Sequence, residues 1–428
     1  MATQECDVLI CGAGVGGLVL ALALGRQGVA VQLLERSPVP PMPRRAENLQ
    51  PNGLRVLDQL GLLRLLSSAG AHRNEQFHFV SIDDDGGGAP LCTIDYRELP
   101  GPYPYTLITT PSVMQPLLLT AVAGQPTVAC RWGLTMTGLA HESGGLRISA
   151  TDAAGAPITV RARMLVGADG VASTVRQAAA IPARVHVYRD GYATMIVPRP
   201  KALGLGSRYG VGRGRILALF PVSASEMALL YLVRRDRWAA AQAGGLDALK
   251  ARIIAAAPLT AESLQTVTSW EQVGFMPCAR VRAGRWTGDR VALIGDAAHA
   301  MNPHVAQGRN QAMVDALVLA EVIADGLKRD DLSRAHLDRY ERAQRPRVER
   351  LQRVADELTL FWNNDAWPVG WLRGRVFRTL ARNRRLRGRM TAFVAGLPVE
   401  PYSLGERFQA AGFLPDPRAD EFVTIPES

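Results

Sequence analysis

A glycine-rich turn near the N-terminus has the residue types and spacing needed to hold a phosphate group. An apolar run of strand length, residues 7–11, is followed by Gly12, Gly14 and Gly17 in G-x-G-x-x-G spacing, which opens an alanine- and leucine-rich helix. The first glycine permits a tight turn, the second lets a pyrophosphate approach the backbone, and the third lets helix and strand pack closely. The pattern predicts dinucleotide binding.

An acidic residue completes this unit. Glu35 ends a second apolar run, residues 29–35, and lies 23 residues after Gly12. A carboxylate at this place binds ribose hydroxyls, and it suits the free 2′-hydroxyl of FAD or NAD better than a 2′-phosphate. We place the adjacent Arg36 among the expected cofactor-binding residues as well.

Two further motifs follow apolar strands later in the chain. Residues 167–176 read GADGVASTVR, and residues 295–299 read GDAAH directly after the strand RVALI. The second motif is followed by Pro303, Gly308, Asn310 and Asp315. In this order and at these separations, the three motifs resemble those of the group A flavoprotein monooxygenases, the family of para-hydroxybenzoate hydroxylase. The resemblance covers about residues 5–345.

The resemblance implies how FAD is bound. The glycine turn and Glu35 would hold its ADP half, and Asp296 would bind the ribityl and pyrophosphate region. The segment beginning at Asp169 would border both FAD and the approach of the nicotinamide cofactor. Arg44 and Arg45 lie where the family places an arginine near the flavin or pyrophosphate, and we favour Arg45.

The loop from Pro303 to Asn310 would lie at the flavin ring. Unpaired N–H groups at the start of the following helix suit the negative charge of reduced flavin, so Gly308, Arg309 and Asn310 are expected to bind the cofactor. Pro303 and Gly308 are the candidate catalytic residues of this loop. The family's usual Gly-Gln-Gly begins here with Ala306. Because alanine tolerates positive φ poorly, we expect an altered loop backbone.

Two other positions receive specific expectations. Ser112 stands where many members of the family have a glutamine or arginine that touches the FAD ribose, so this contact is expected to be weakened or supplied elsewhere. His299 is expected to be a packed or capping histidine and not a base. No cluster of residues suggests a metal site.

The reaction implied by the resemblance is hydroxylation of an aromatic or heteroaromatic small molecule. NADH or NADPH would reduce the flavin, O₂ would add at flavin C4a, and the hydroperoxide would transfer oxygen to the substrate. Tyr209 is a candidate phenol contact, with a core tyrosine as the alternative. N-hydroxylation, Baeyer–Villiger oxidation, isoprenoid reduction and a non-enzymatic FAD-fold accessory protein remain open.

Composition limits the compartment and the class of protein. The chain of 428 residues has five cysteines without C-x-x-C spacing, which favours a reducing, cytoplasmic compartment. Residues 8–25 carry no charge, but five of these 18 residues are glycines, so a membrane span is not expected.

The positive charge is concentrated near the C-terminus. The segment from Arg373 to Arg389 has eight arginines and no acid, and removing those charges from the net +10 leaves +2. Nucleic-acid binding is therefore not indicated. Arg375, Arg378, Arg382 and Arg385 are expected to form one basic helix face, solvated or acid-paired. The alternatives are weak peripheral contact with an anionic lipid surface and docking of a polyanion or a protein. We expect this segment to be dispensable for the chemistry.

The elements that must position these residues form an α/β fold. A Rossmann-like FAD-binding domain would comprise residues 1–73, 101–182 and 284–345. An inserted β-sheet substrate domain would comprise residues 74–100, with a turn at 83–88, and residues 183–283. Residues 346–428 would form a mainly helical C-terminal region. The oligomeric state is left open.

Overall fold

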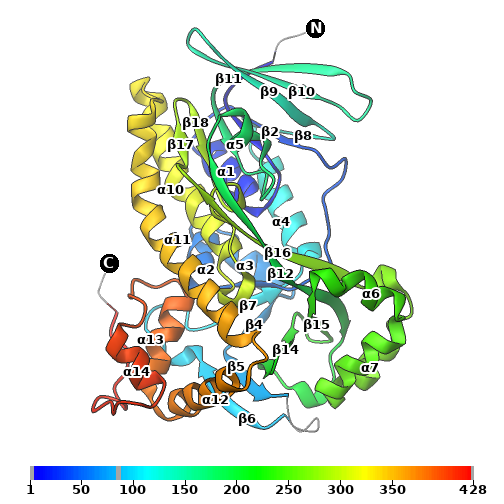
Figure 1. Cartoon of the computed structure of the whole chain (residues 1–428). Coiled ribbons are helices and arrows are strands. Elements are labelled where there is room, and N and C mark those ends of the chain that lie inside the picture. Colours follow the sequence, from blue (N-terminus) through cyan, green and yellow to red (C-terminus); the bar gives the residue numbers. More distant parts are fainter. Residues whose placement is uncertain (1–3, 83–87, 426–428) are drawn as a thin grey trace.

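The fold was determined as a computed structural model that describes residues 4–82 and 88–425 (Figure 1). Its first sheet has eight strands in the order β17-β18-β11-β1-β2-β8, with β10 and β9 branching from β11. The five strands from β18 to β8 run parallel, so their carboxyl ends meet at one edge. The strands are β1 (Gln4–Cys11), β2 (Val31–Glu35), β8 (Val128–Trp132), β9 (Thr135–Glu142), β10 (Gly145–Thr151), β11 (Pro157–Gly167), β17 (Thr287–Gly288) and β18 (Val291–Leu293).

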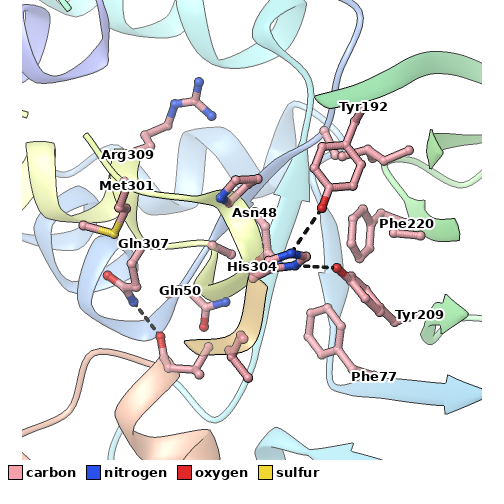
Figure 2. A pocket seen from close by; sticks show the side chains of 18 of the residues that line it. Asn48, Gln50, Phe77, Tyr192, Tyr209, Phe220, Met301, His304, Gln307 and Arg309 are labelled. Atoms are coloured by element: carbon pink, nitrogen blue, oxygen red, sulfur yellow. Dashed lines mark hydrogen bonds between the residues drawn. The ribbon is translucent and has the colours of Figure 1, made fainter. Parts of the chain in front are cut away.

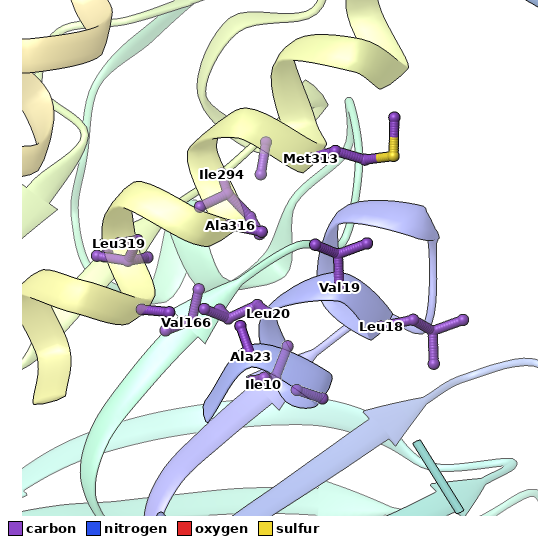
Figure 3. Packing of buried hydrophobic residues seen from close by; sticks show 14 of the residues in the cluster. Ile10, Leu18, Val19, Leu20, Ala23, Val166, Ile294, Met313, Ala316 and Leu319 are labelled. Carbon is purple, nitrogen blue, oxygen red and sulfur yellow. The ribbon is translucent and has the colours of Figure 1, made fainter. Parts of the chain in front are cut away.

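Helices cover this sheet and bury its apolar residues. In α1 (Val15–Gly25) every residue after Val15 is buried, because β1 packs on one side and α10 (Gly308–Arg329) on the other. Figure 3 shows Leu20 of α1 beside Val166 of β11, and Leu319 of α10 belongs to the same buried cluster. An all-round apolar helix of this kind is stable only inside a protein, and here it fixes the glycine turn at its start. Two further helices of this region are α4 (Pro111–Ala123) and α5 (Thr174–Ala178).

A second sheet of seven strands lies beside the first. Its order is β16-β12-β15-β14-β13-β5-β6, so the segment before residue 100 pairs with strands after residue 183. One face packs on α7 (Leu246–Ala256) and α8 (Ala261–Gln265), and α6 (Trp238–Ala243) lies nearby. The strands are β5 (Gln76–Ser81), β6 (Pro90–Asp95), β12 (Ala183–Pro198), β13 (Ser207–Gly212), β14 (Arg215–Pro221), β15 (Glu226–Arg234) and β16 (Gly274–Ala283).

A small third sheet has the order β3-β7-β4. It consists of β3 (Glu47–Leu49), β4 (His72–Asn74) and β7 (Thr106–Thr109), with α2 (Pro51–Gln59) and α3 (Leu63–Ser68) between β3 and β4. The expected boundary after residue 73 therefore falls inside β4. The expected turn at 83–88 lies outside the described residues except for Gly88.

The C-terminal region is helical: α11 (Arg334–Trp362), α12 (Trp367–Arg382), α13 (Arg384–Val394) and α14 (Leu404–Ala410). The expected boundary after residue 345 falls inside α11, which joins this region to the rest of the chain. The prediction of one basic helix face is wrong, because Asn383 ends α12 and its side chain accepts a hydrogen bond from Leu386 N at the start of α13. Of the helices in the described ranges, none is long and apolar enough to cross a membrane.

Candidate functional site

A cavity of about 550 Å³ lies where the carboxyl ends of the first sheet meet the second sheet and the C-terminal helices. Its lining begins at the glycine turn, continues along the loop before α10, and ends among aromatic side chains of the second sheet and α12. The volume is within the usual range of small-molecule sites. Segments far apart in sequence thus share one chamber.

The three glycines of the turn have different roles. Gly12 has φ +108°, and a Cβ there would lie 2.4 Å from the Ala168 carbonyl oxygen. A Cβ on Gly17 would lie 2.0 Å from the Gly12 carbonyl oxygen. Gly14 is different, since a Cβ would meet no atom within 4 Å and the residue lines the cavity. The first and third glycines allow close backbone packing, whereas the second leaves open space beside the N-terminus of α1.

The Glu35 carboxylate lies at the end of β2 and braces this turn. It accepts hydrogen bonds from Ala13 N and Ser37 N, both at 2.9 Å. Each carboxylate oxygen accepts one of these bonds and keeps a further lone pair. Its neighbour Arg36 is exposed and does not line the cavity.

Asp169 is engaged within the protein. Its carboxylate accepts hydrogen bonds from Ser173 Oγ, at 2.5 Å, and from the first backbone N–H groups of α5. The cavity is lined instead by its neighbours Ala168 and Gly170. Arg176, in the same motif, donates to the Ala297 carbonyl oxygen at 2.7 Å and so links the second motif to the third. A direct contact of Asp169 with the cofactor stays a prediction.

The third motif places one acid in the cavity and a second in the core. Asp296 begins α9 (Asp296–His299), is exposed, and lines the cavity. His299 is buried, and its Nε2 lies 2.6 Å from an oxygen of buried Asp315. Burial opposes protonation, but the adjacent carboxylate outweighs it and raises the pKa of His299. With Trp286 against its ring, His299 is a packed residue, as expected from the sequence.

The loop before α10 keeps the backbone that its alanine was expected to lose. Ala306 has φ +49° and ψ +32°, in the left-handed region, so the expectation of an altered backbone there is wrong. The conformation holds because Asn310 donates to the Ala306 carbonyl oxygen at 2.7 Å and Gln307 donates to the Val394 carbonyl oxygen at 2.6 Å. The next glycine, Gly308, lines the cavity, and a Cβ there would lie 3.9 Å from its nearest neighbours.

The Asn310 side chain connects the start of α10 with the segment around β3 by hydrogen bonds. It is fully buried, accepts from Gln50 N at 3.0 Å, and donates to the Asn48 carbonyl oxygen at 3.0 Å. Its side chain therefore holds β3 against α10. Any contact of Asn310 with a cofactor would come from its backbone.

Two arginines and one buried acidic residue lie close to Asn310. The Arg309 guanidinium lies 2.5 Å from Glu47, and Arg45 lies 3.9 Å from the same carboxylate. Both arginines line the cavity, whereas Arg44 is exposed outside it. Burial lowers the pKa of Arg309, although Glu47 opposes this shift. Among the described residues, the charged side chains of the lining are Arg45, Arg309 and Asp296.

The opposite end of the cavity is aromatic and holds one histidine. His304, in the 3-10 turn Pro303–Val305, lies between two phenols: Tyr209 Oη is 3.0 Å from Nδ1 and Tyr192 Oη is 3.3 Å from Nε2 (Figure 2). Burial lowers the pKa of His304 to about 3, so the ring is neutral. Burial also raises the pKa of both tyrosines, which stay protonated. The surrounding rings are Phe77, Phe79, Phe220, Trp362 and Phe377.

Of this group, the sequence indicated only Tyr209. His304 follows Pro303 directly in the loop that was expected to lie at the flavin ring, and that position was the signal that could have identified it. Tyr192 gave no signal, because it comes from β12 in the middle of a strand-rich stretch.

The arginine-rich segment contributes to the cavity wall. Val376, Phe377 and Leu380 of α12 line the cavity, as do Met390, Thr391 and Val394 of α13. The segment therefore contributes to the cavity through side chains other than its arginines, and the expectation that it is dispensable for the chemistry stays a prediction for the arginines. Its arginines face away from the cavity, and several are paired with acids, as in the ion pair of Arg387 with Glu98.

The residues present fit FAD. Gly14 leaves an open cradle at the N-terminus of α1, where three N–H groups lack partners within the helix. The N-terminus of α10 opens on the same cavity at Gly308. Asn48 lines the cavity between them, and its buried Oδ1 accepts no hydrogen bond among the described residues. These groups offer donors for phosphates and an acceptor for a ring N–H.

Comparison with known proteins identifies the family. The FAD binding domain family matches residues 5–355. A 6-methylpretetramide 4-monooxygenase of Streptomyces rimosus is 34% identical over 354 residues, which cover 81% of this chain and 82% of that protein. A phenazine 1,6-dicarboxylic acid hydroxylase of Lysobacter antibioticus is 31% identical over 379 residues, covering 81% and 88% of the two chains.

Solved structures show the same fold. The p-nitrophenol 4-monooxygenase of Pseudomonas putida DLL-E4 superposes with a TM-score of 0.77 at 21% identity, covering 92% of this chain and 99% of that one. The cradle for FAD, the match over most of the chain and these relatives lead to one conclusion. This chain belongs to the FAD-binding family of the group A flavoprotein monooxygenases, and it is an FAD-dependent monooxygenase.

Proposed function

We propose that the protein hydroxylates a bulky, uncharged aromatic or heteroaromatic molecule, consuming NADH or NADPH and O₂. The observation that carries the proposal is the division of the cavity into two chemical ends. The three charged lining residues lie with the cofactor motifs, and the far end is formed by aromatic rings, two phenols and a neutral imidazole. A substrate carboxylate would find no cation there among the described residues, so a simple benzoate fits poorly.

Bound FAD supplies the chemistry that the side chains lack, namely acceptance of a hydride from the nicotinamide and activation of O₂. The first turn of α1 would hold its phosphates, and Glu35 and Asp296 would bind its hydroxyl-bearing parts. The first N–H groups of α10 would stabilise negative charge at the flavin ring. Arg309 and Arg45 stabilise negative charge at the same end, and Glu47 fixes their position.

The Tyr192–His304–Tyr209 group orients the substrate and holds a proton for it. A neutral imidazole has one N–H donor and one acceptor nitrogen. One tyrosine therefore donates to the ring, and the other accepts from it. A substrate hydroxyl bonded to the oxygen of the donating tyrosine can pass a proton along this chain: the proton of that tyrosine moves to the acceptor nitrogen of His304, the proton of the opposite N–H moves to the second tyrosine, and the O–H proton of the second tyrosine is released. The apolar walls exclude water around it.

Two of the relatives are named for molecules larger than a single ring, which supports a bulky substrate. The Streptomyces relative acts on 6-methylpretetramide and the Lysobacter relative on a phenazine dicarboxylic acid. The cytoplasm is our proposed compartment, because all five cysteines carry free thiols.

The test uses protein reconstituted with FAD and a panel of neutral polycyclic phenols alongside simple benzoates. We expect oxidation of NADH or NADPH to be stimulated by the phenols, with a product one oxygen atom heavier. An oxygen inserted into a ring, a hydroxylated nitrogen or a gain of two hydrogens would identify a different reaction. Stimulation by benzoates alone would contradict the substrate class.

A further inference from the structure

The outer surface of the C-terminal helices carries an exposed apolar patch. Among the large hydrophobic side chains exposed in the described residues, every aromatic one lies between residues 367 and 422. Trp371, Phe408 and Phe413 are each about half exposed, and Leu404 is 72% exposed. The Phe413 ring lies 6.3 Å from Trp371 and 6.4 Å from Phe408, so these side chains form one continuous patch. Trp371, Leu404, Phe408, Phe413 and Leu414 are called the aromatic patch below.

A basic groove borders this patch. Arg375, Arg378 and Arg382 recur on one face of α12 and line a groove of about 400 Å³ that Leu414 also lines. The Arg375 guanidinium lies 5.2 Å from the Trp371 ring and 5.0 Å from the Phe413 ring. Positive charge and aromatic surface are therefore in direct contact.

The groove keeps its positive charge. Its one acid, Asp416, accepts from Asn383 and Arg385, at 2.9 and 2.8 Å, and so already has a cationic partner. Both Arg378 and Arg382 are exposed, and in the described part of the chain neither has an acidic side chain within ion-pair distance. Other arginines of the segment are paired, for example Arg384 with Glu98.

We propose that this surface docks on an anionic phospholipid membrane. Tryptophan and phenylalanine settle at the boundary between headgroups and acyl chains, and arginines beside them bind lipid phosphates. The aromatic patch supplies the tryptophan and phenylalanine side chains, and the groove supplies the arginines. The net charge of the chain, which is concentrated in this segment, is complementary to such a surface.

The position of α12 gives docking a consequence for the enzyme. The helix presents Val376, Phe377 and Leu380 to the cavity. It presents Arg375, Arg378 and Arg382 to the groove on another face. One helix therefore separates the cavity from the docked membrane. An apolar substrate dissolved in the bilayer would reach the protein at this wall.

The test is sedimentation of the FAD-loaded protein with vesicles. Vesicles of mixed phosphatidylglycerol and phosphatidylcholine should pellet the protein at low salt and less of it at high salt, whereas vesicles of phosphatidylcholine alone should pellet little. The double substitution Arg378→Gln and Arg382→Gln should weaken binding about tenfold or more. The matched control is Arg64→Gln with Arg237→Gln, which removes the same charge from exposed positions elsewhere.

The apolar arm uses Leu404→Ser with Phe408→Ser. This pair should also weaken binding, whereas Leu65→Ser with Leu205→Ser, equally exposed, should not. Absence of pelleting by anionic vesicles overturns the proposal, and so does an equal effect of test and control pairs. Light scattering that shows a dimer, lost in the Leu404 and Phe408 variant, would assign the patch to self-association instead. None of these outcomes depends on the substrate proposed above.

Discussion

Arg385 is the residue on which we expect the C-terminal region to depend most strongly. It is 5% exposed, and its guanidinium donates to Asp416, Glu406 and Gln409 at 2.8, 2.8 and 2.9 Å. Replacing it by methionine keeps the side-chain stem but leaves two largely buried carboxylates without this cation. Removing one partner of a buried ion pair costs about 3–5 kcal/mol. Because Arg389 still reaches Glu406, at 2.9 Å, we expect about 3 kcal/mol.

The matched control is Arg382→Met. Arg382 is only three residues away, carries the same charge and is exposed, so its loss should change stability by less than about 0.5 kcal/mol. The assay is urea unfolding of the FAD-loaded protein, together with the rate of limited proteolysis after residue 383. We expect Arg385→Met to expose the C-terminal helices to protease and Arg382→Met to leave them protected. If the two variants had the same free energy of unfolding and the same rate of proteolysis, Arg385 would not be the cation on which the C-terminal region depends.

The same cluster predicts a pH dependence. Burial alone would raise the pKa of Asp416 and of Glu406, but hydrogen bonds from Asn383, Arg385 and Ser403 outweigh it and hold both pKa values below their usual range. Carboxylates with lowered pKa stabilise the fold above their unfolded pKa, near pH 4, and this stabilisation is lost as pH falls through the folded pKa. The difference in stability between wild type and Arg385→Met should therefore shrink below about pH 4. A constant difference from pH 7 to pH 3 would contradict the ionic explanation.

Three further substitutions test the cavity. Ala306→Gly removes the strain of an alanine in the left-handed region and should raise the free energy of unfolding by about 0.5 kcal/mol, measured by thermal unfolding. An unchanged free energy of unfolding would show that the alanine is not strained. His304→Phe should lower turnover at least about tenfold with flavin absorbance unchanged, whereas loss of flavin would show a binding role. Asp296→Ala should reduce flavin occupancy more than His299→Ala does, and His299→Ala should lower the midpoint of thermal unfolding instead. The reverse result would assign cofactor binding to His299 and core packing to Asp296.

The glycine turn could be predicted from the sequence because its constraints are local. Gly12 and Gly17 are required because a Cβ at either position would come within 2.4 Å of a backbone oxygen, whereas a Cβ on Gly14 would meet no protein atom within 4 Å. Each requirement leaves a glycine at a fixed spacing, which is visible in the sequence. Glu35 follows from the length of one strand–helix–strand unit.

The backbone at Ala306 could not be predicted, because the preference of a single residue was weighed without its partners. Alanine disfavours positive φ by about 1–2 kcal/mol. The hydrogen bonds that hold the loop come from Asn310, four residues later, and from Gln307 to the Val394 carbonyl oxygen of α13. The second of these joins segments 87 residues apart, and no local pattern indicates it.

The substrate end depends on such long-range contacts throughout. Tyr192, Tyr209 and His304 come from two strands and a loop that the fold brings to within hydrogen-bond distance.

The arrangement of the arginine-rich segment was also predicted wrongly because it depends on long-range contacts. The sequence shows eight positive charges but not which of them form ion pairs with acidic side chains. Asn383 breaks the segment into two helices, so Arg385 turns into the C-terminal region while Arg378 and Arg382 stay outside. The break at Asn383 therefore divides this segment into a buried ion pair and an exposed basic groove. Replacing Asn383 by alanine should therefore disturb both, because its side chain caps α13 and bonds Asp416.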